Sequence, residues 1–136
     1  MIHYLWEKSP YKLLTDPECV DFDFVTRQLA TSYWASTCSQ PQIEKSIANS
    51  IPFSLYLQED QIGFARVITD KAVFACLADV IIAPRHRGKG LGKWMLSCIL
   101  THPDLQGCKI LLETCGAHKL YAQFGFETRE CMKKQL

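Results

Sequence analysis

A short basic, glycine-rich segment at residues 85–93 carries the clearest chemical signal in the chain. It places four basic side chains and three alternating glycines within nine residues, in the order Arg85-His86-Arg87-Gly88-Lys89-Gly90-Leu91-Gly92-Lys93. Glycines let the oxygens of a ligand approach the backbone, because no Cβ stands in the way. Unpartnered backbone N–H groups at the start of a helix attract anions, and phosphate most naturally. The segment therefore predicts a turn that binds an anion such as a phosphate group.

The flanking segments predict the elements that position this turn. Residues 72–83 form an apolar run with a single charge, Asp79, which indicates a buried strand that breaks at Pro84. After the glycines, apolar residues recur at 91, 94, 95, 98 and 99, the spacing of one face of an α-helix. We therefore predict a buried strand, an anion-binding turn and an amphipathic helix that runs from about residue 89 to residue 101.

Three glycine-rich motifs that bind phosphate compete to explain the turn. A P-loop requires Ser or Thr after its lysine, but Trp94 follows Lys93. A dinucleotide fingerprint requires the spacing G-x-G-x-x-G, whereas these glycines lie at 88, 90 and 92. Residues 85–90 match a third pattern, [Q/R]-x-x-G-x-[G/A]. In this they resemble the pyrophosphate-binding motif of the GNAT superfamily, the acyl-coenzyme-A-dependent N-acyltransferases.

A second stretch carries the same resemblance. Ala117-x-x-x-Tyr121-x-x-x-Gly125-Phe126 is similar to a later motif of the family, A-x-x-[LF]-Y-E-K-x-G-F, and its order and distance from the first motif also fit. With their flanking elements, the two motifs cover residues 50–130 approximately. Two positions depart from the family pattern: Thr114 stands where many members have asparagine, and Ala122-Gln123 replaces the usual Glu-Lys pair.

The remaining pattern predicts an α+β domain. We expect further strands at 11–15, 53–58, 62–68, 109–113 and 126–132, and further helices from Asp21, from Ser39 and over 116–124. Because a helical crossover joins the strand at 72–83 to the strand at 109–113, these two strands should be parallel. The resemblance implies one GNAT-like domain over residues 1–136. Its central, twisted, mostly antiparallel mixed sheet would have six to seven strands, a splayed parallel pair at its centre and about four flanking helices.

The resemblance also implies acetyl-CoA as the acyl donor. Its pyrophosphate would lie on the amides of Gly88 to Lys93, and its pantetheine arm along the splayed strand. The expected cofactor-binding residues are Val80, Ile81, Ile82, Arg85, Arg87, Gly88, Lys89, Gly90, Leu91, Gly92, Lys93, Thr114, His118 and Tyr121. Ordinary core packing is the alternative for residues 80–82, and both interpretations hold together if the side chains pack while the backbone serves the ligand.

The implied reaction transfers an acetyl group to a primary amine. The resemblance places the Tyr121 hydroxyl near the cofactor sulfur, where it would protonate the leaving thiolate as general acid. A core tyrosine is the alternative interpretation. The general base is assigned to Asp79 or Glu113, with Asp70 a weaker candidate. A structural or solvated carboxylate is the alternative for each.

The acceptor pocket is expected between the N-terminal helices and the central strands. Candidate lining residues are Tyr33, Trp34, Phe53, Arg66 and Phe74. Aromatic residues at helical and strand spacing are more often core, so core packing is the competing interpretation for them.

Composition limits the alternatives. The 136 residues carry a formal net charge of +1, which does not favour nucleic acid or an anionic membrane as partner. No run approaches the ~18 apolar residues of a membrane span, and the N-terminus lacks a signal-peptide pattern. The seven cysteines contain no C-x-x-C pair, so we expect a cytoplasmic protein with reduced thiols and no metal.

The partner of the reaction stays open. A small-molecule or peptide amine is expected as acceptor, and dimers are common in the family, so a homodimer is compatible with the resemblance. A non-catalytic module that binds or senses acyl-CoA is the alternative to an enzyme. A protein that uses the basic turn for nucleotides or nucleic acid is a third hypothesis, which the near-neutral charge disfavours.

Overall fold

The predicted strand, turn and helix are present in the computed structural model, which describes residues 2–136. The strands are β1 (Leu5–Lys8), β2 (Tyr11–Leu14), β3 (Ile51–Leu57), β4 (Asp60–Thr69), β5 (Phe74–Ile82) and β6 (Lys109–Leu111). The α-helices are α1 (Phe22–Ala30), α2 (Gln40–Ala48), α3 (Leu91–Ile99) and α4 (His118–Ala122). Short 3-10 helices lie at Pro17–Cys19, Pro84–His86 and Pro103–Leu105.

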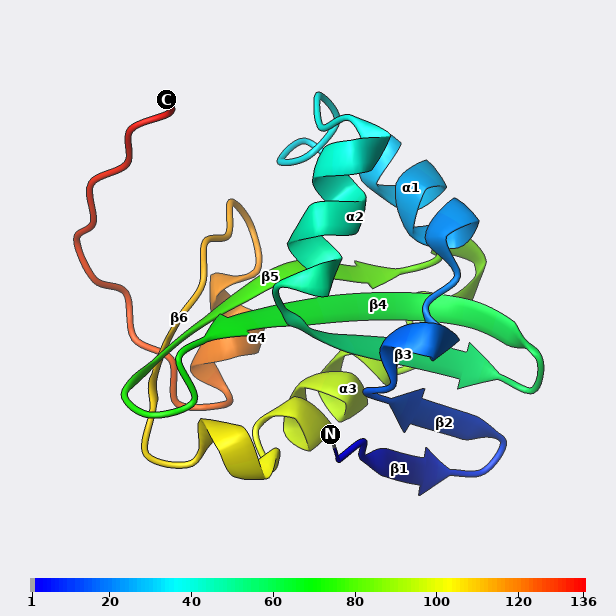
Figure 1. The fold of residues 1–136 in the computed structure, drawn as a ribbon. Helices are drawn as coiled ribbons and strands as arrows, with labels where there is room; N and C mark the ends of the chain where they lie inside the picture. Colours follow the sequence, from blue (N-terminus) through cyan, green and yellow to red (C-terminus); the bar gives the residue numbers. More distant parts are fainter. Residues whose placement is uncertain (1) are drawn as a thin grey trace.

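The six strands form one sheet in chain order, from β1 to β6 (Figure 1). Each strand pairs antiparallel with the next except the last two, β5 and β6, which are parallel. The α3 crossover between β5 and β6 imposes this direction, because parallel neighbours cannot be joined by a tight hairpin. The expected α+β fold, with a mixed and mostly antiparallel sheet and a parallel pair, is confirmed.

Helices cover both faces of the sheet, with α1 and α2 on one face and α3 on the other (Figure 1). Under α1 and α2, the buried core contains Phe24, Val25, Leu29, Ile43, Ile47, Phe64 and Ile81. Under α3, it contains Leu13, Phe53, Leu55, Val67, Leu77, Leu91, Met95 and Ile99. Because successive strand side chains point to opposite faces, β4 and β5 contribute to both cores and hold the two layers together.

The start of α2 is fixed by a reciprocal cap that the sequence predicted. The Ser39 hydroxyl oxygen accepts from the Gln42 amide at 3.3 Å, and the Gln42 side-chain oxygen accepts from the Ser39 amide at 2.7 Å. Asp21 caps α1 in a similar way, accepting from the Phe24 amide at 3.1 Å. These caps set the rotation of both helices, so their isoleucine and phenylalanine faces meet the sheet.

Near the chain ends, the sequence missed one strand and predicted another that does not form. β1 is absent from the predictions, because a strand of four residues with mixed exposure gives little periodic signal. The strand predicted over Phe126–Met132 is wrong: residues 127–136 are exposed and extended, with no strand partner. Figure 1 shows this segment running away from the sheet. Within residues 2–136, no backbone hydrogen bond joins residues 127–136 to another segment, so no ladder forms. Side chains of this segment make exposed ion pairs, such as Lys133 with Glu113.

Candidate active site

The glycine turn before α3 presents a row of unpartnered backbone amides. Gly88 and Gly90 have φ of +78° and +77°, a left-handed conformation that glycine adopts without steric cost. The first helical hydrogen bond comes from the Trp94 amide to the Gly90 carbonyl, at 3.0 Å. Within residues 2–136, no group accepts from the amides of residues 88–93, and a Cβ built on Gly88 or Gly90 would meet open space. This geometry can bind an anion at the positive end of α3.

Basic side chains surround these amides. Arg85, Lys89 and Lys93 are exposed and available to an anion. The Arg87 guanidinium folds back, and its Nε donates to the Ile82 carbonyl at 2.8 Å. Arg87 therefore ties the turn to the end of β5, which positions the amides relative to that strand.

The parallel strands β5 and β6 diverge just before the turn. Their pairing ends with Cys76 opposite Leu111, yet β5 continues to Ile82. Past Cys76, the edge of β5 that faces β6 has no strand partner among the described residues, so its backbone can pair with an extended ligand. The predicted splay of the parallel pair is confirmed, and the pair lies at the edge of the sheet.

A bulge re-aims the side chains of β5 at this divergence. The register of β4 against β5 shifts between Phe64 and Arg66, and Asp79 has φ of +52°. A bulge bends the strand and locally exposes its backbone and side chains. Here it directs the Asp79 carboxylate toward Arg66 on β4.

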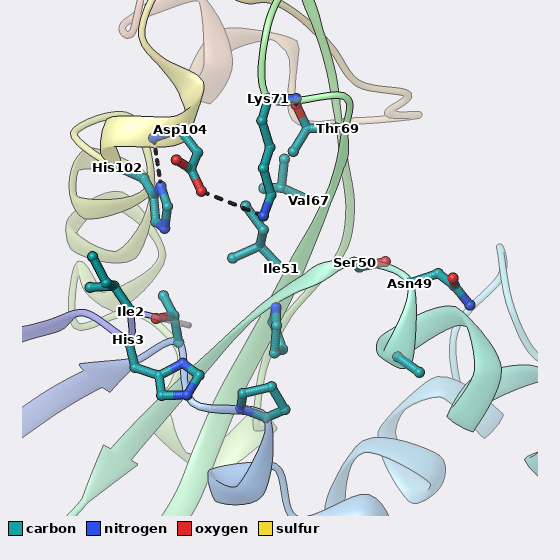
Figure 2. A pocket seen from close by; sticks show the side chains of 14 residues that line it. Ile2, His3, Asn49, Ser50, Ile51, Val67, Thr69, Lys71, His102 and Asp104 are labelled. Carbon is teal, nitrogen blue, oxygen red and sulfur yellow. Dashed lines mark hydrogen bonds and ion pairs between the residues drawn. The ribbon is translucent and has the colours of Figure 1, made fainter.

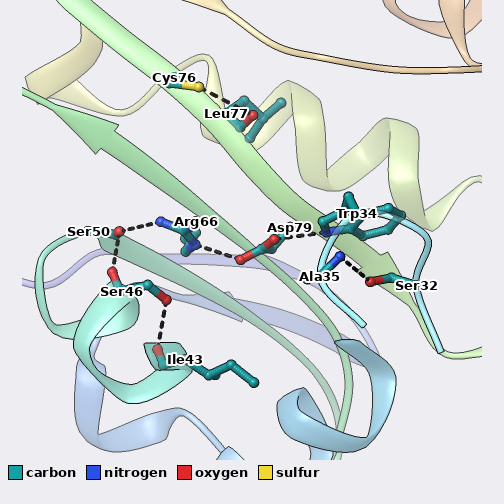
Figure 3. A network of polar contacts seen from close by, with 10 residues as sticks. All are labelled: Ser32, Trp34, Ala35, Ile43, Ser46, Ser50, Arg66, Cys76, Leu77 and Asp79. Atoms are coloured by element: carbon teal, nitrogen blue, oxygen red, sulfur yellow. Dashed lines mark hydrogen bonds and ion pairs between the residues drawn. The ribbon is translucent and has the colours of Figure 1, made fainter. Parts of the chain in front are cut away.

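Asp79 and Arg66 form a largely buried ion pair. The Arg66 Nε lies 2.6 Å from the Asp79 Oδ2, and the side chains are 16% and 9% exposed. The Trp34 indole N–H donates to the other carboxylate oxygen at 2.9 Å. Arg66 also donates to the Ser50 hydroxyl at 3.1 Å (Figure 3). Both oxygens of Asp79 are thus engaged, and the pair joins β4, β5 and the segment after α1.

A cleft of ≈ 820 Å³ opens at the same place. Its walls come from α2, the segment after α1, the bulged part of β5 and the loop between β6 and α4. Tyr33, Trp34 and Arg66 line it from the predicted acceptor set. The predicted carboxylates, Asp79 and Glu113, line it as well.

Three residues predicted to bind the cofactor also line this cleft, namely Val80, Thr114 and Tyr121. Residues predicted for the donor side and residues predicted for the acceptor side therefore line one cavity. His118 is exposed on α4 and lies outside the lining. Ile81 is 5% exposed and packs under α1 and α2, so only its backbone can serve a ligand.

Tyr121 offers a free phenol to the cleft. It is half-buried, its ring packs edge-on against Phe126 at 5.8 Å, and its hydroxyl has no hydrogen-bond partner among residues 2–136. Burial raises the pKa of Tyr121, and Tyr33 nearby raises it further. The phenol is therefore protonated at neutral pH and can donate a proton.

Aromatic side chains form part of the rim of the cleft and connect segments that are far apart in the sequence. The Tyr33 and Trp34 rings meet edge-to-face at 5.0 Å, and both are strongly exposed. The Tyr33 hydroxyl accepts from the Cys115 amide at 3.2 Å, which links the segment after α1 to the β6–α4 loop. Glu113 lies on the same rim, exposed, with the Lys133 ammonium 3.5 Å away.

Two predicted acceptor residues lie elsewhere. Phe53 is fully buried in the core under α3, and Phe74 begins β5 outside the cleft lining. In their place the structure adds Gln42 and Ser46, four residues apart on α2, beside the buried isoleucines. The spacing of four residues could have predicted this, because it places both polar side chains on the same face of α2, next to the face that packs against the sheet. Lys133 also lines the cleft, but no pattern in the sequence predicted its place there.

The cleft also contains a half-buried free thiol. Cys76 lines the cavity, and burial raises its pKa, an effect that Arg66 opposes only in part. The thiolate is the reactive form of cysteine, and a raised pKa disfavours it. The other polar groups that line the cleft include the Tyr121 phenol and the carboxylates of Asp79 and Glu113.

The family model for the acetyltransferase (GNAT) domain matches residues 49–128, more than half of the chain. The chain belongs to the GNAT acetyltransferase family. A GNAT-family candidate acetyltransferase from Xanthomonas campestris pv. campestris, solved as a crystal structure, is 33% identical with a TM-score of 0.90, covering 96% of each chain. The Gibberella zeae protein FG08082, a candidate acetyltransferase, is 30% identical across 75% of this chain and 68% of its own length.

A more distant solved structure shares the fold. N-acetylglutamate synthase from Neisseria gonorrhoeae, solved with coenzyme A and L-arginine, has a TM-score of 0.67 at 17% identity, covering 81% of this chain and 26% of its own. In the chain described here, no helix within residues 2–136 has the length and apolar character needed to cross a bilayer. The same residues bring together no group of three His, Cys, Asp or Glu side chains that could hold a metal ion.

Proposed function

We propose that the protein is an acetyl-CoA-dependent N-acetyltransferase that acts on a primary amine. The observation that carries this proposal is the connection between three features. The open edge of β5 beyond Cys76 begins at the cleft that the free phenol of Tyr121 lines. The strand ends at Ile82, to which Arg87 ties the turn that carries the unpartnered amides of residues 88–93. The coenzyme A bound by the Neisseria relative supports the same choice of donor.

The chain's own residues fit this donor in size and charge. The amides of residues 88–93 and the side chains of Arg85, Lys89 and Lys93 would hold the pyrophosphate, and the open edge of β5 at Val80 would hold the pantetheine arm. Bound there, acetyl-CoA supplies an acetyl group activated as a thioester. An amide on the β5 edge would polarise the carbonyl of that thioester.

Proton transfers are assigned to two residues of the cleft. Tyr121 holds a proton on its phenol oxygen for the departing thiolate, and its raised pKa keeps that proton in place at neutral pH. Asp79 already accepts from Arg66 and Trp34, whereas Glu113 is exposed on the rim. We therefore assign to Glu113 the proton that the amine loses, taken through water. Asp79 has a structural role: it positions Arg66 and Trp34 on the acceptor side of the cleft.

The experiment incubates the purified chain with acetyl-CoA and a panel of amines: amino acids, polyamines, amino sugars and lysine peptides. Acetylated products are detected by mass spectrometry, because the exposed cysteines Cys38, Cys115 and Cys131 would react with thiol reagents. We expect at least one amine to be acetylated. Acetyl-CoA binding without any product across the panel would instead establish a non-catalytic module.

Tyr121→Phe tests the acid. We expect kcat to fall by roughly 10²-fold, the lower end of the contribution of a positioned acid, with KM for acetyl-CoA unchanged. The matched control is Tyr11→Phe on β2, outside the cleft, which should keep the wild-type kcat. A wild-type kcat in Tyr121→Phe would remove Tyr121 from the mechanism.

A further inference from the structure

A second cavity lies away from the cleft and shares no lining residue with it. Its volume is ≈ 230 Å³, and it lies between the N-terminal segment, the C-terminal end of α2, the β4–β5 hairpin and the 3-10 helix Pro103–Leu105 (Figure 2). We call it the His102 pocket. Nothing in the proposed acetyl transfer uses it.

His102 points an unpaired donor into this pocket. The residue is 2% exposed, and its Nδ1 accepts from the Asp104 amide at 3.1 Å. A neutral imidazole that accepts at Nδ1 carries its proton on Nε2. The Nε2 atom has no hydrogen-bond partner among residues 2–136, and Figure 2 shows it directed at the hollow. The rest of the residue is buried, so this N–H is held in place facing the hollow, where a bound acceptor can reach it.

Two further donors line the same hollow. Thr15 is 4% exposed, and its hydroxyl oxygen accepts from the Tyr4 amide at 2.8 Å while its own proton goes to no described residue. Lys71 extends from the β4–β5 hairpin with its ammonium turned to the pocket (Figure 2). The neighbouring carboxylates are already paired, Asp104 with Lys71 at 3.8 Å and Asp16 with His3 at 3.8 Å.

We propose that the His102 pocket binds a small carboxylate. A carboxylate is acceptor-only, so it complements the donor groups of His102, Thr15 and Lys71, which all line the pocket. Lys71 already faces Asp104, and an ammonium has three N–H donors, so it can donate to a ligand as well. The remaining wall is partly apolar, through Ile51, Pro52 and Val67, which suits a short carbon chain rather than a bare inorganic anion. The ligand class is therefore a carboxylate with a few carbon atoms.

The test uses the full chain saturated with coenzyme A, so that the amides of residues 88–93 are occupied. Sodium butyrate is titrated at constant ionic strength while the ring nitrogens of His102 are followed by NMR. We expect a saturable shift of the Nε2 resonance. Sodium chloride at the same ionic strength should give none. Absence of a saturable shift with butyrate overturns the proposal.

Variants locate the site. Lys71→Ala should weaken butyrate binding about tenfold, as expected when a charge-assisted hydrogen bond is lost. Lys12→Ala, on the exposed side of β2, should bind like the wild type. Thr15→Val should also weaken binding, and Lys71→Ala keeps the test decisive if Thr15→Val does not fold. Wild-type affinity in Lys71→Ala, or tighter binding of inorganic phosphate than of butyrate, overturns the proposal. Neither result would bear on the acetyl transfer.

Discussion

Among single residues, Asp79 is the most constrained group of the cleft. Its backbone is held at φ of +52°, and its two carboxylate oxygens accept from Arg66 and from Trp34. A left-handed backbone is uncommon outside glycine, and aspartate is among the residues that tolerate it best. One side chain thus joins the sheet to the segment that carries the aromatic rim.

Asp79→Asn should lower the free energy of unfolding by about 3 kcal/mol, because it leaves the largely buried Arg66 guanidinium without a counter-charge. Asparagine tolerates the same backbone, so the substitution isolates the charge. Urea denaturation measures the change. Glu113→Gln is the matched control: its pair with Lys133 is exposed, and the expected change is within about 0.5 kcal/mol. Equal stabilities for the two variants would refute the structural role of Asp79.

At the scale of elements, the turn into α3 combines a steric and an electrostatic role. Gly90→Ala should lower the free energy of unfolding by about 1 kcal/mol, since alanine is strained at φ of +77°. It should also weaken coenzyme A binding about tenfold, because the new Cβ stands before the free amides. Calorimetric titration measures the affinity.

The control for this turn is Gly107→Ala. Gly107 has φ of +87° and open space at its Cβ, but it lies in the loop before β6, away from the anion site. It should lose a similar amount of stability while coenzyme A affinity stays at the wild-type value. Equal affinities for coenzyme A in both glycine variants would show that the turn does not contact the ligand.

Elements with a strong local signal were predictable from sequence. The apolar run at 72–83, the glycines and the spacing 91, 94, 95, 98 and 99 gave β5, the turn and α3 within a few residues. The Ser39–Gln42 capping box gave the start of α2. The strand over Phe126–Met132 failed for a non-local reason. A strand exists only with a neighbour, and the sequence pattern says nothing about whether that neighbour is within reach.

At the scale of the whole molecule, the candidate site is a product of topology. The bond from the Cys115 amide to the Tyr33 hydroxyl joins residues 82 positions apart, and the bond from Trp34 to Asp79 joins residues 45 apart. The family resemblance singled out Tyr121, and residue type and position singled out Asp79 and Glu113, but only the fold shows that the three share a cleft. The same limit explains Phe53: its strand pattern is identical for a pocket residue and a core residue.

The fold also makes stability depend on pH through His102. Burial lowers the pKa of His102 below its usual value of about 6.5, an effect that Asp104 opposes only in part. The unfolded chain therefore binds a proton more readily than the folded one near this pH. Stability is fully present above about pH 6.5, and it declines as the pH falls through the lowered pKa of the folded state.

Urea denaturation from pH 8 to pH 5, in buffers free of carboxylates, measures this dependence. His102→Phe should reduce the slope of unfolding free energy against pH, because phenylalanine fills the aromatic cluster with Tyr4 and Phe53 and does not titrate. The comparison concerns the slope, so a uniform loss of stability in this variant does not affect it. His118→Gln, at an exposed position on α4, should keep the wild-type slope. A wild-type slope in His102→Phe would mean that the pH dependence arises from other groups.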